Sequence, residues 1–447
     1  MDDVNSLPVH TSGGISAGMA DGPGLAKWRR AKHKPLAGTY LALLAFMVVY
    51  CTRPEDLIPG LSSVPLAKIT GALAVVAFVL SLRHVRFPLP REVIFLILLV
   101  GQFLISASMS PIWRVGAILK TLEFGKVMIV VLVMASAVVT AERFYRLILV
   151  QAASIALIAA ISVWKGHLMS RRLAGLLSGN YSNPNDLALA IVISLPLCLA
   201  LLLSSRSTFS KVAWVLAMGV MTYAVFLTGS RGGFFSLLVT LTFCVWEFSI
   251  RGRHRYLLVL IAVLAIVLLP FSPKMLTSRL RATFSSKADI TAYDSAQQRE
   301  QLFRRSVEIT AKHPFFGIGP GNFEIVSGSW HVTHNTFTEL SSEAGVPALT
   351  LFLLILSRGF RNVRRIKRSS RGQRKLSVFA GGLYASLAGY LTGAIFTSTG
   401  YQFFPYLLVA YTTALHLIAK ESLKKERGTV NRAATKLCAY QAEPCAG

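Results

Sequence analysis

Twelve apolar runs of roughly the length that crosses a bilayer recur along the chain and constrain its fold more than any other feature. They lie at 36–52, 65–82, 92–109, 116–139, 144–164, 186–204, 210–228, 232–250, 255–271, 346–358, 377–398 and 403–419, and the start of the tenth is expected upstream, toward Leu340. Inside a membrane the backbone polar groups must pair within the segment, so such runs form helices. The sequence therefore predicts an all-α polytopic membrane protein with about 12 transmembrane helices.

The charge distribution supports this division of the chain. Only 15% of the residues are charged, yet 47 Lys+Arg against 20 Asp+Glu give a net charge of +27. This combination excludes a soluble enzyme, a disordered tail protein and a disulfide scaffold, and the apolar runs exclude an ordinary nucleic-acid binder. With the N-terminus inside, 30 of the cations lie in or beside inside segments and 6 in short outside loops. That bias follows the positive-inside rule and predicts that both termini are cytoplasmic.

The runs divide the chain into five parts. The prediction is a disordered cytoplasmic N-terminus (1–35), transmembrane helices 1–9 (36–271), a large outside loop with an amphipathic helix (272–345), helices 10–12 (346–419) and a disordered cytoplasmic tail (420–447). The first 35 residues lack a signal peptide pattern, so the first apolar run is expected to be the anchor. The basic inside loop 358–375 is interpreted as a topology anchor at the cytoplasmic leaflet rather than a nucleic-acid site.

The outside loop 272–345 is the largest segment without an apolar run. Ser295–Lys312 reads as an amphipathic helix with Ser295 as N-cap, Gln298 completing a capping box, and Pro314 ending it. At about 100° per residue, one face carries Leu302, Phe303, Ser306, Val307 and Thr310. Arg299 lies on that face, so it is either directed at a ligand or is a structural arginine beside apolar neighbours.

The loop re-enters the membrane through HNTFTELSSEAGVPA (334–348), which contains His334, Asn335 and Glu343. A neutral imidazole at a membrane-edge cleft is suited to act as general base, although a lone histidine is more often structural. In one continuous helix Glu343 would fall opposite His334. A His334–Glu343 dyad therefore requires a break after Asn335; otherwise the two residues do different jobs.

Two short outside turns add cationic and anion-binding features. LTGSRGG (227–233) is too short to hide Arg231, and SGNYSNPNDLA (178–188) places Asp186 as the N-cap of the sixth span. With the loop, these turns predict an outside cluster of Arg171, Arg172, Arg231, Arg279, Arg281, Arg299 and His334. Arginine forks bind a diphosphate bidentately.

Charged residues within the spans leave two interpretations open. Lys120, Glu123 and Lys126 either line a groove for a donor or reflect an i, i+3 ion pair between Lys120 and Glu123. A transporter or flippase would need more such residues deep in the spans. The candidates for that role are Lys68, Lys120, Glu123, Lys126, Glu247 and His416, and most lie near span ends.

No metal or cofactor motif is visible. The chain has no D-x-D, no H-E-x-x-H and no P-loop, and the glycines of HPFFGIGPGNF (313–323) form a tight loop rather than a dinucleotide fingerprint. We therefore expect no metal and no cofactor. An enzyme working outside the cytoplasm without ATP needs an activated donor, and a lipid-diphosphate sugar fits.

Four motifs resemble the O-antigen ligase superfamily, and the resemblance covers roughly residues 140–400. They are NPNDLA after span five, LTGSRGG between spans seven and eight, HPFFGIGPGNF, and HN followed by E-A-G at span ten. Twelve spans with a large loop between spans nine and ten are also similar to that superfamily, which includes O-antigen and exopolysaccharide polymerases.

The resemblance implies a GT-C-like membrane fold and an inverting, metal-independent glycosyltransferase of the bacterial inner membrane. Such an enzyme moves a glycan from undecaprenyl diphosphate to a hydroxyl of lipid A core, or of another glycan or protein acceptor, at the periplasmic face. His334 would accept the acceptor's proton, and Arg231 and Arg299 would hold the diphosphate. Further candidates for binding diphosphate or glycan are Arg172, Arg279, Asn183, Asn335 and Glu343.

The ligase loop pattern leaves polymerisation as an alternative. His334, Asn335 and Gly345 match the pattern His-Asn, nine residues, G-x-x-G, but Ala348 occupies the place of the second glycine. A polymerase shares the donor and differs in the acceptor. A polysaccharide transporter or flippase is the third and weakest interpretation.

Overall fold

The computed structural model describes most of the 447-residue chain. The described residues are 36–58, 60–61, 63–81, 89–166, 168–169, 172–175, 181–252, 255, 290–328, 330–369 and 373–441, with the backbone alone at 168–169, 290–296 and 425–441. The predicted N-terminal segment 1–35 and nearly all of the ninth span lie outside the described residues. So do four residues of the predicted outside features: His167, Arg171, Arg279 and Arg281.

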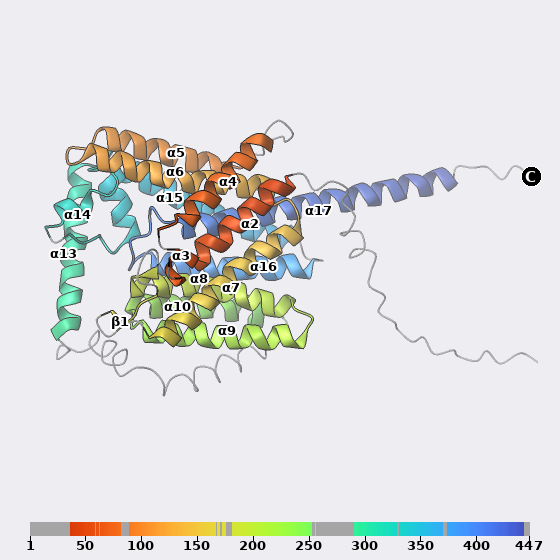
Figure 1. The fold of residues 1–447 in the computed structure, drawn as a ribbon. Coiled ribbons are helices and arrows are strands. Elements are labelled where there is room, and N and C mark those ends of the chain that lie inside the picture. Colours follow the sequence, from red (N-terminus) through yellow and green to blue (C-terminus); the bar gives the residue numbers. More distant parts are fainter. Residues whose placement is uncertain are drawn as a thin grey trace, which may run out of the picture.

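Helices make up nearly all of the described chain (Figure 1). In order they are α2 (Ala37–Thr52), α3 (Pro54–Leu57), α4 (Leu66–Ser81), α5 (Arg91–Ser108), α6 (Arg114–Ala137), α7 (Ala141–Lys165), α8 (Pro184–Ser204), α9 (Thr208–Leu227), α10 (Arg231–Cys244) with a π-helical end (Val245–Ile250), α13 (Ile290–Lys312), α14 (Phe323–Val326), α15 (Thr336–Ser369), α16 (Arg374–Gly393) and α17 (Phe403–Gln441). The strands β1 (Leu168–Met169) and β2 (Arg172–Leu173) pair antiparallel, with Leu168 opposite Leu173.

Each predicted span that falls in the described residues coincides with a helix. Within this part of the chain, eight helices are long and apolar enough to cross a membrane: α2 with α3, α5, α7, α8, α9, α10 with its π-helical end, α15 and α17. The apolar α4 is shorter. The chain is thus an all-α polytopic membrane protein, as its apolar runs predict.

α8 lies at the centre of the bundle. It packs against α7, α9, α10 and α16, and nearly all its side chains are buried. A helix that is apolar all round is expected to be enclosed by other helices. On the outer helices, by contrast, large apolar side chains are exposed, such as Leu73 of α4, Leu119 of α6 and Leu216 of α9. These exposed faces suit contact with lipid chains.

The loops that carry the candidate chemistry gather at one end of the bundle. We call it the loop-bearing end; it holds α13, α14 and the segments that precede α8, α10 and α15 (Figure 1). α17 leaves the bundle at the opposite end and runs away from it (Figure 1).

Two helices extend beyond the predicted boundaries. α15 begins at Thr336, upstream of 346 as expected and four residues before Leu340, and it is kinked at Gly345, where the backbone is non-helical (φ 84°, ψ 168°). It runs to Ser369, so most of the predicted basic loop is helical. α17 continues to Gln441, where the sequence predicted a disordered tail from 420. Arg, Lys, Glu and Ala are strong helix formers, and no proline interrupts the C-terminal extensions of α15 and α17, so both helices propagate past the apolar runs.

α13 corrects the prediction for the amphipathic helix. It ends at Lys312 as predicted but begins at Ile290, so Ser295 and Gln298 lie within it rather than forming a capping box. Leu302 and Ser306 are buried as predicted, whereas Phe303 and Val307 are nearly half exposed. Ile309 takes their place in a small core with Leu302, the loop residue Ile318 and Phe323, the first residue of α14. The segment around Ile318 and Phe323 decides which face of α13 is covered. The periodicity of the helix sequence carries no information about the position of that segment.

Candidate active site

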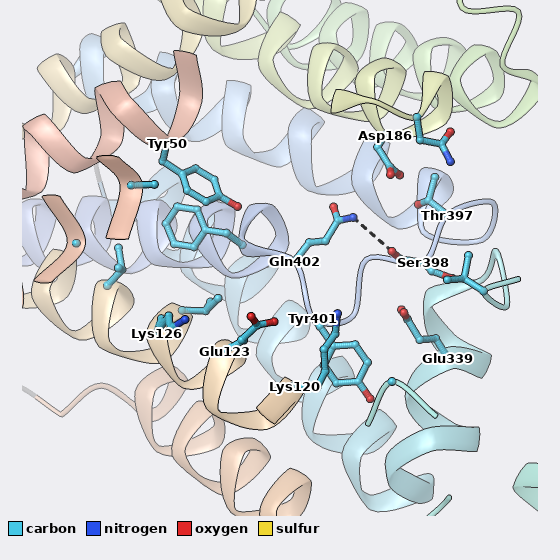
Figure 2. Close-up of a pocket in the computed structure, with 18 of the residues that line it drawn as sticks. Tyr50, Lys120, Glu123, Lys126, Asp186, Glu339, Thr397, Ser398, Tyr401 and Gln402 are labelled. Atoms are coloured by element: carbon cyan, nitrogen blue, oxygen red, sulfur yellow. Dashed lines mark hydrogen bonds between the residues drawn. The ribbon is translucent and has the colours of Figure 1, made fainter. Parts of the chain in front are cut away.

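A cavity of about 790 Å³ opens among the loops at the loop-bearing end and extends along α2, α4 and α6 (Figure 2). The charged and amide side chains that line it are Arg53, Lys68, Lys120, Glu123, Lys126, Asn183, Asn185, Asp186, Glu324, His334, Glu339, Glu343 and Gln402. Figure 2 shows Lys120, Glu123 and Lys126 on one wall, with Asp186 and Glu339 across the cavity. This size is typical of a ligand site rather than a packing defect.

His334 lies just before α15, in a left-handed backbone conformation with φ 52°. The helix starts two residues later, and Asn335 caps it by accepting hydrogen bonds from the N–H groups of Phe337 (2.9 Å) and Thr338 (3.2 Å). Burial lowers the pKa of His334 to about 4, and the charges of Arg299, His331 and Arg172 act in the same direction. At neutral pH the imidazole is therefore unprotonated and able to accept a proton.

Glu343 has a different setting from His334. Its carboxylate accepts hydrogen bonds from the backbone N–H of Gly321 (2.7 Å) and of Phe323 (3.1 Å). The break after Asn335 that a His334–Glu343 dyad requires is present, because α15 begins at Thr336. The hydrogen bonds of Glu343 nevertheless go to the HPFFGIGPGNF loop. The structure thus favours the alternative in which His334 and Glu343 do different jobs.

The glycines of HPFFGIGPGNF let this loop lie against the start of α15. Gly317 and Gly319 have positive φ, and the N–H groups of Ile318 and Gly319 donate to the carbonyls of Ser342 (3.0 Å) and Glu343 (2.8 Å). A Cβ on Gly317 would lie 2.3 Å from the backbone of Glu343. The motif is a close-packed loop, as predicted, and its N–H groups are used within the protein rather than for a phosphate.

The motifs NPNDLA and LTGSRGG also meet. Asn185 of α8 accepts hydrogen bonds from Ser230 Oγ (2.7 Å) and from Arg172 Nη2 (2.9 Å). Arg172 Nε donates further to the carbonyl of Thr228 (2.8 Å). Gly233 permits this approach, because a Cβ there would lie 2.6 Å from Ala188. The four motifs therefore form two pairs at the loop-bearing end, although they are dispersed over residues 183–345 of the sequence.

The sixth span has a different N-cap from the one predicted. Asn183 caps α8 by accepting a hydrogen bond from the N–H of Asn185 (2.9 Å), and Pro184 occupies the first helical position. Asp186 lies in the first turn, lines the cavity and hydrogen-bonds Gln402. Proline at the first position favours a cap immediately before it, a signal that the sequence contains.

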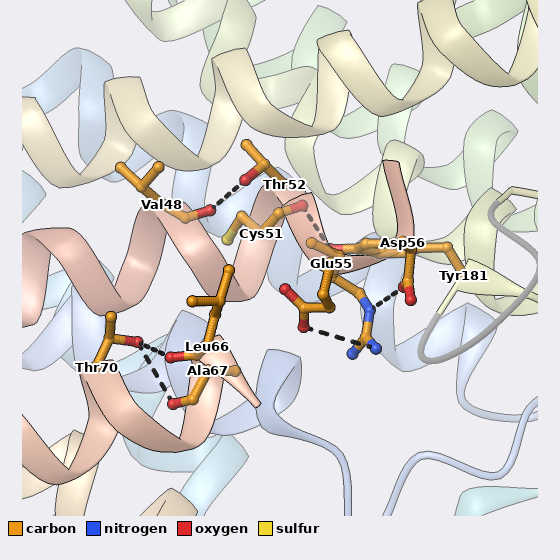
Figure 3. A network of polar contacts seen from close by, with 10 residues as sticks. Val48, Cys51, Thr52, Glu55, Asp56, Leu66, Ala67, Thr70 and Tyr181 are labelled. Atoms are coloured by element: carbon orange, nitrogen blue, oxygen red, sulfur yellow. Dashed lines mark hydrogen bonds and ion pairs between the residues drawn. The ribbon is translucent and has the colours of Figure 1, made fainter. Parts of the chain in front are cut away.

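Arg53 is a cavity residue that sequence reasoning missed. It lies between α2 and α3 with φ 46°, forms an ion pair with Asp56 and lies 3.8 Å from Glu55 (Figure 3). Tyr181 anchors the same turn by donating to the carbonyl of Cys51 (3.3 Å). The two acids hold the guanidinium at the cavity wall. The sequence does contain a signal for this arrangement, because the single arginine of this outside loop is followed directly by Pro-Glu-Asp.

The predicted charges on α6 do line the cavity. Lys120, Glu123 and Lys126 are exposed and lie along its wall, and no ion pair between Lys120 and Glu123 is seen in the described chain. Lys120 Nζ lies 5.9 Å from the ring centroid of Tyr401, which reaches a cation–π distance. Of the two interpretations, the structure favours a charged groove over the local pair.

The structure brings together only part of the predicted site. His334, Asn183 and Glu343 line the cavity, and Arg172 and Arg299 lie close enough to His334 to lower its pKa. Arg231 is the first residue of α10, beside the Asn185–Ser230 contact, but it does not line the cavity. Among the described residues, no group of three or more His, Cys, Asp and Glu side chains could hold a metal ion.

Residues 216–353 match the family model described as O-Antigen ligase. This part of the chain, about a third of its length, is similar to the O-antigen ligase family. The matched region runs from α9 through α10 and α13 to the middle of α15, so it contains Arg231, Arg299, His334 and Glu343. No curated protein matches the chain. This similarity supports a ligase or polymerase type of function in general terms.

Proposed function

We propose that this protein is a glycosyltransferase that moves a glycan from undecaprenyl diphosphate to an acceptor hydroxyl, such as one of lipid A core. The observation that carries the proposal is His334, whose pKa is lowered to about 4 at the wall of a 790 Å³ cavity that basic side chains flank. A neutral imidazole and several fixed cations are what transfer from a diphosphate requires. The family match supports the same reaction class.

The reaction is a direct displacement. His334 accepts the proton of the acceptor hydroxyl as its oxygen attacks the anomeric carbon, and the bond from that carbon to the diphosphate oxygen breaks. The configuration inverts, and the polyprenyl diphosphate leaves with the bonding electrons. Arg299 and Arg172 supply positive charge near His334, and Lys120 supplies it from the opposite wall, so the leaving group's negative charge is stabilised without a metal.

The proposal includes a topology. The loop-bearing end faces the periplasm, both termini face the cytoplasm, and about 12 helices cross the bacterial inner membrane in a GT-C-like arrangement. The distribution of Lys and Arg supports this orientation. The groove along α2, α4 and α6 then gives a lipid-linked donor a path from the outer leaflet to His334.

Glycan polymerisation is the second candidate, favoured by Ala348 in place of the second glycine of the ligase pattern. Ala348 is completely buried, so its effect would be on the packing of α15 and not on direct contact with an acceptor. The two reactions differ only in the acceptor, a core oligosaccharide or a second lipid-linked repeat.

The test compares envelope glycolipids of a deletion strain complemented with wild type, His334→Ala or His313→Ala. His313 is an exposed histidine of the same loop and serves as the matched control. For a ligase, the deletion and His334→Ala remove polymer from lipid A core and accumulate lipid-linked polymer, while His313→Ala restores the wild-type pattern. Core capped by a single repeat identifies a polymerase. Full activity of His334→Ala at normal protein level removes the proposed role of His334.

A reaction with purified components separates enzyme from transporter. Protein in nanodiscs is mixed with synthetic undecaprenyl-diphosphate glycan and acceptor, and the glycosylated acceptor is measured by mass spectrometry. Product formation that depends on His334 supports transfer. Movement of the donor across a vesicle membrane without any product would instead identify a flippase.

A further inference from the structure

A second cavity, of about 350 Å³, lies at the end of the bundle opposite the candidate active site. It is enclosed by the start of α5, the basic part of α15 and α17. Glu92 lines it near one end of the 18-residue α5, while Ser106 near the other end bonds to Glu343. A helix rises about 1.5 Å per residue, so the two cavities are separated by roughly 20 Å along the bundle. The second cavity therefore belongs to a different site.

The charges around this cavity are predominantly positive. Arg358 Nε forms a buried ion pair of 3.0 Å with Glu92, the one acid in the lining. Arg91 and Arg365 also line the cavity, and both are exposed. Because Glu92 is already balanced by Arg358, two guanidinium groups remain to attract an anion.

Two polar atoms in the cavity wall are buried without a hydrogen-bond partner in the described residues. They are Asn362 Oδ1 and His416 Nδ1, and the whole Asn362 side chain is 1% exposed. Asn362 Nδ2 donates to Glu92 (3.0 Å), which fixes the amide so that Oδ1 is the free atom. A buried polar atom without a partner costs free energy, so a bound group that supplies the missing contacts is favoured.

The wall is also partly apolar. Leu89, Pro90 and Leu417 line the cavity beside the arginines, so its occupant has both an anionic and an apolar part. The cavity lies between helix ends at one limit of the membrane-spanning bundle, where lipid headgroups are found. Basic pockets of this kind between transmembrane helices bind anionic lipid headgroups.

We propose that this cavity binds the headgroup of an anionic phospholipid, with the phosphate between Arg91, Arg365 and His416. A headgroup hydroxyl donates to Asn362 Oδ1, and the lipid's glycerol region lies against Leu89 and Leu417. An anionic lipid with headgroup hydroxyls, such as phosphatidylglycerol, satisfies each of these contacts. Phosphatidylcholine has the same phosphate but no headgroup hydroxyl for Asn362, and the arginines repel its quaternary ammonium.

The test measures lipid binding to the full-length protein by native mass spectrometry and by thermal unfolding. Delipidated protein is titrated with phosphatidylglycerol, phosphatidylcholine or inorganic phosphate. Arg365→Gln removes a lining cation, and Arg361→Gln removes an exposed arginine of the same helix that does not line the cavity. We expect Arg365→Gln to weaken phosphatidylglycerol binding about tenfold and Arg361→Gln to leave it within twofold of wild type.

Three results would overturn the proposal. They are equal binding by the two variants, no preference for phosphatidylglycerol over phosphatidylcholine, and displacement of bound phosphatidylglycerol by inorganic phosphate alone. The last result would mean a site for a free anion. Because the readout is lipid binding, it does not depend on which reaction the first cavity performs.

Discussion

Ser230, the N-cap of α10, donates a hydrogen bond of 2.7 Å to Asn185 and so joins the start of α10 to the first turn of α8. The same Asn185 oxygen accepts from Arg172, one of the two arginines that lower the pKa of His334. This contact connects two sequence motifs that are 45 residues apart and orients one of the cations of the candidate site. The NPNDLA motif, which the sequence suggests as part of a ligand site, thus holds Arg172 in position through Asn185.

Asn185→Ala should therefore lower both stability and transfer. It leaves Ser230 and Arg172 without their shared acceptor, at a cost of about 1–3 kcal/mol in the free energy of unfolding. Asn185→Asp keeps an acceptor for both donors and should stay closer to wild type. Thermal unfolding and the transfer assay measure the two effects. Equal behaviour of the two variants would contradict the bracing role.

The pH dependence of the transfer rate should report the pKa of His334. Its lowered pKa keeps the imidazole neutral from pH 8 down to pH 5, so the rate should stay level over this range and fall only toward the pKa of about 4. Arg299→Gln removes a charge that lowers this pKa, so the acid limb should move to higher pH. Arg299→Lys keeps the charge and should leave the limb in place. An unchanged limb in Arg299→Gln would show that the group titrating in the profile is not His334.

The same shift makes a prediction for stability. The folded-state pKa of His334 lies below the ordinary value of 6.5, so between pH 6.5 and 4 the unfolded chain binds more protons than the folded one. Stability therefore falls as the pH falls through this window. His334→Gln should flatten that part of the curve of unfolding midpoint against pH. A slope identical to that of wild type would mean that other groups cause it.

Glu343→Gln should loosen the loop that precedes α14. Each carboxylate oxygen accepts a backbone N–H, from Gly321 and from Phe323, and an amide can offer an acceptor to only one of them. Hydrogen exchange at the amides of 321 and 323 should accelerate, while exchange in α8 stays unchanged. If both amides kept their protection, the loop would be held by other contacts.

Gly345→Ala should disrupt the packing of the HPFFGIGPGNF loop against α15. Gly345 has φ 84°, and a Cβ would lie 2.3 Å from the carbonyl oxygen of Phe315. Gly328→Ala is the matched control, because Gly328 has φ 75° but no atom within 4 Å of a Cβ. Both variants place an alanine at a positive φ, which costs on the order of 1–3 kcal/mol, and only Gly345→Ala adds the clash. The difference between their unfolding midpoints measures the close approach; no difference would mean that the backbone shifts freely.

The features that the sequence predicts correctly are those with a local signal. Apolar runs located the helices because each span must satisfy its own backbone and match a bilayer, and the end of α13 before Pro314 follows from proline geometry. The predictions were wrong or incomplete where contacts with a distant segment decide which residues are buried or line the cavity. Arg53 joined the cavity through acids of the next turn, and the covered face of α13 was set by Ile318 and Phe323.

The sequence by itself determined that the chain is a helical membrane protein, approximately where its helices lie and which motifs carry polar chemistry, because length, hydropathy and turn residues act within one segment. Only the tertiary structure decided how these motifs are paired. It directed the hydrogen bonds of Glu343 to Gly321 and Phe323, assigned Arg172 to Asn185, and aligned the charges of α6 along the cavity wall. Each of these outcomes depends on contacts between residues far apart in the chain, and their energies are set by packing and burial that no local pattern records.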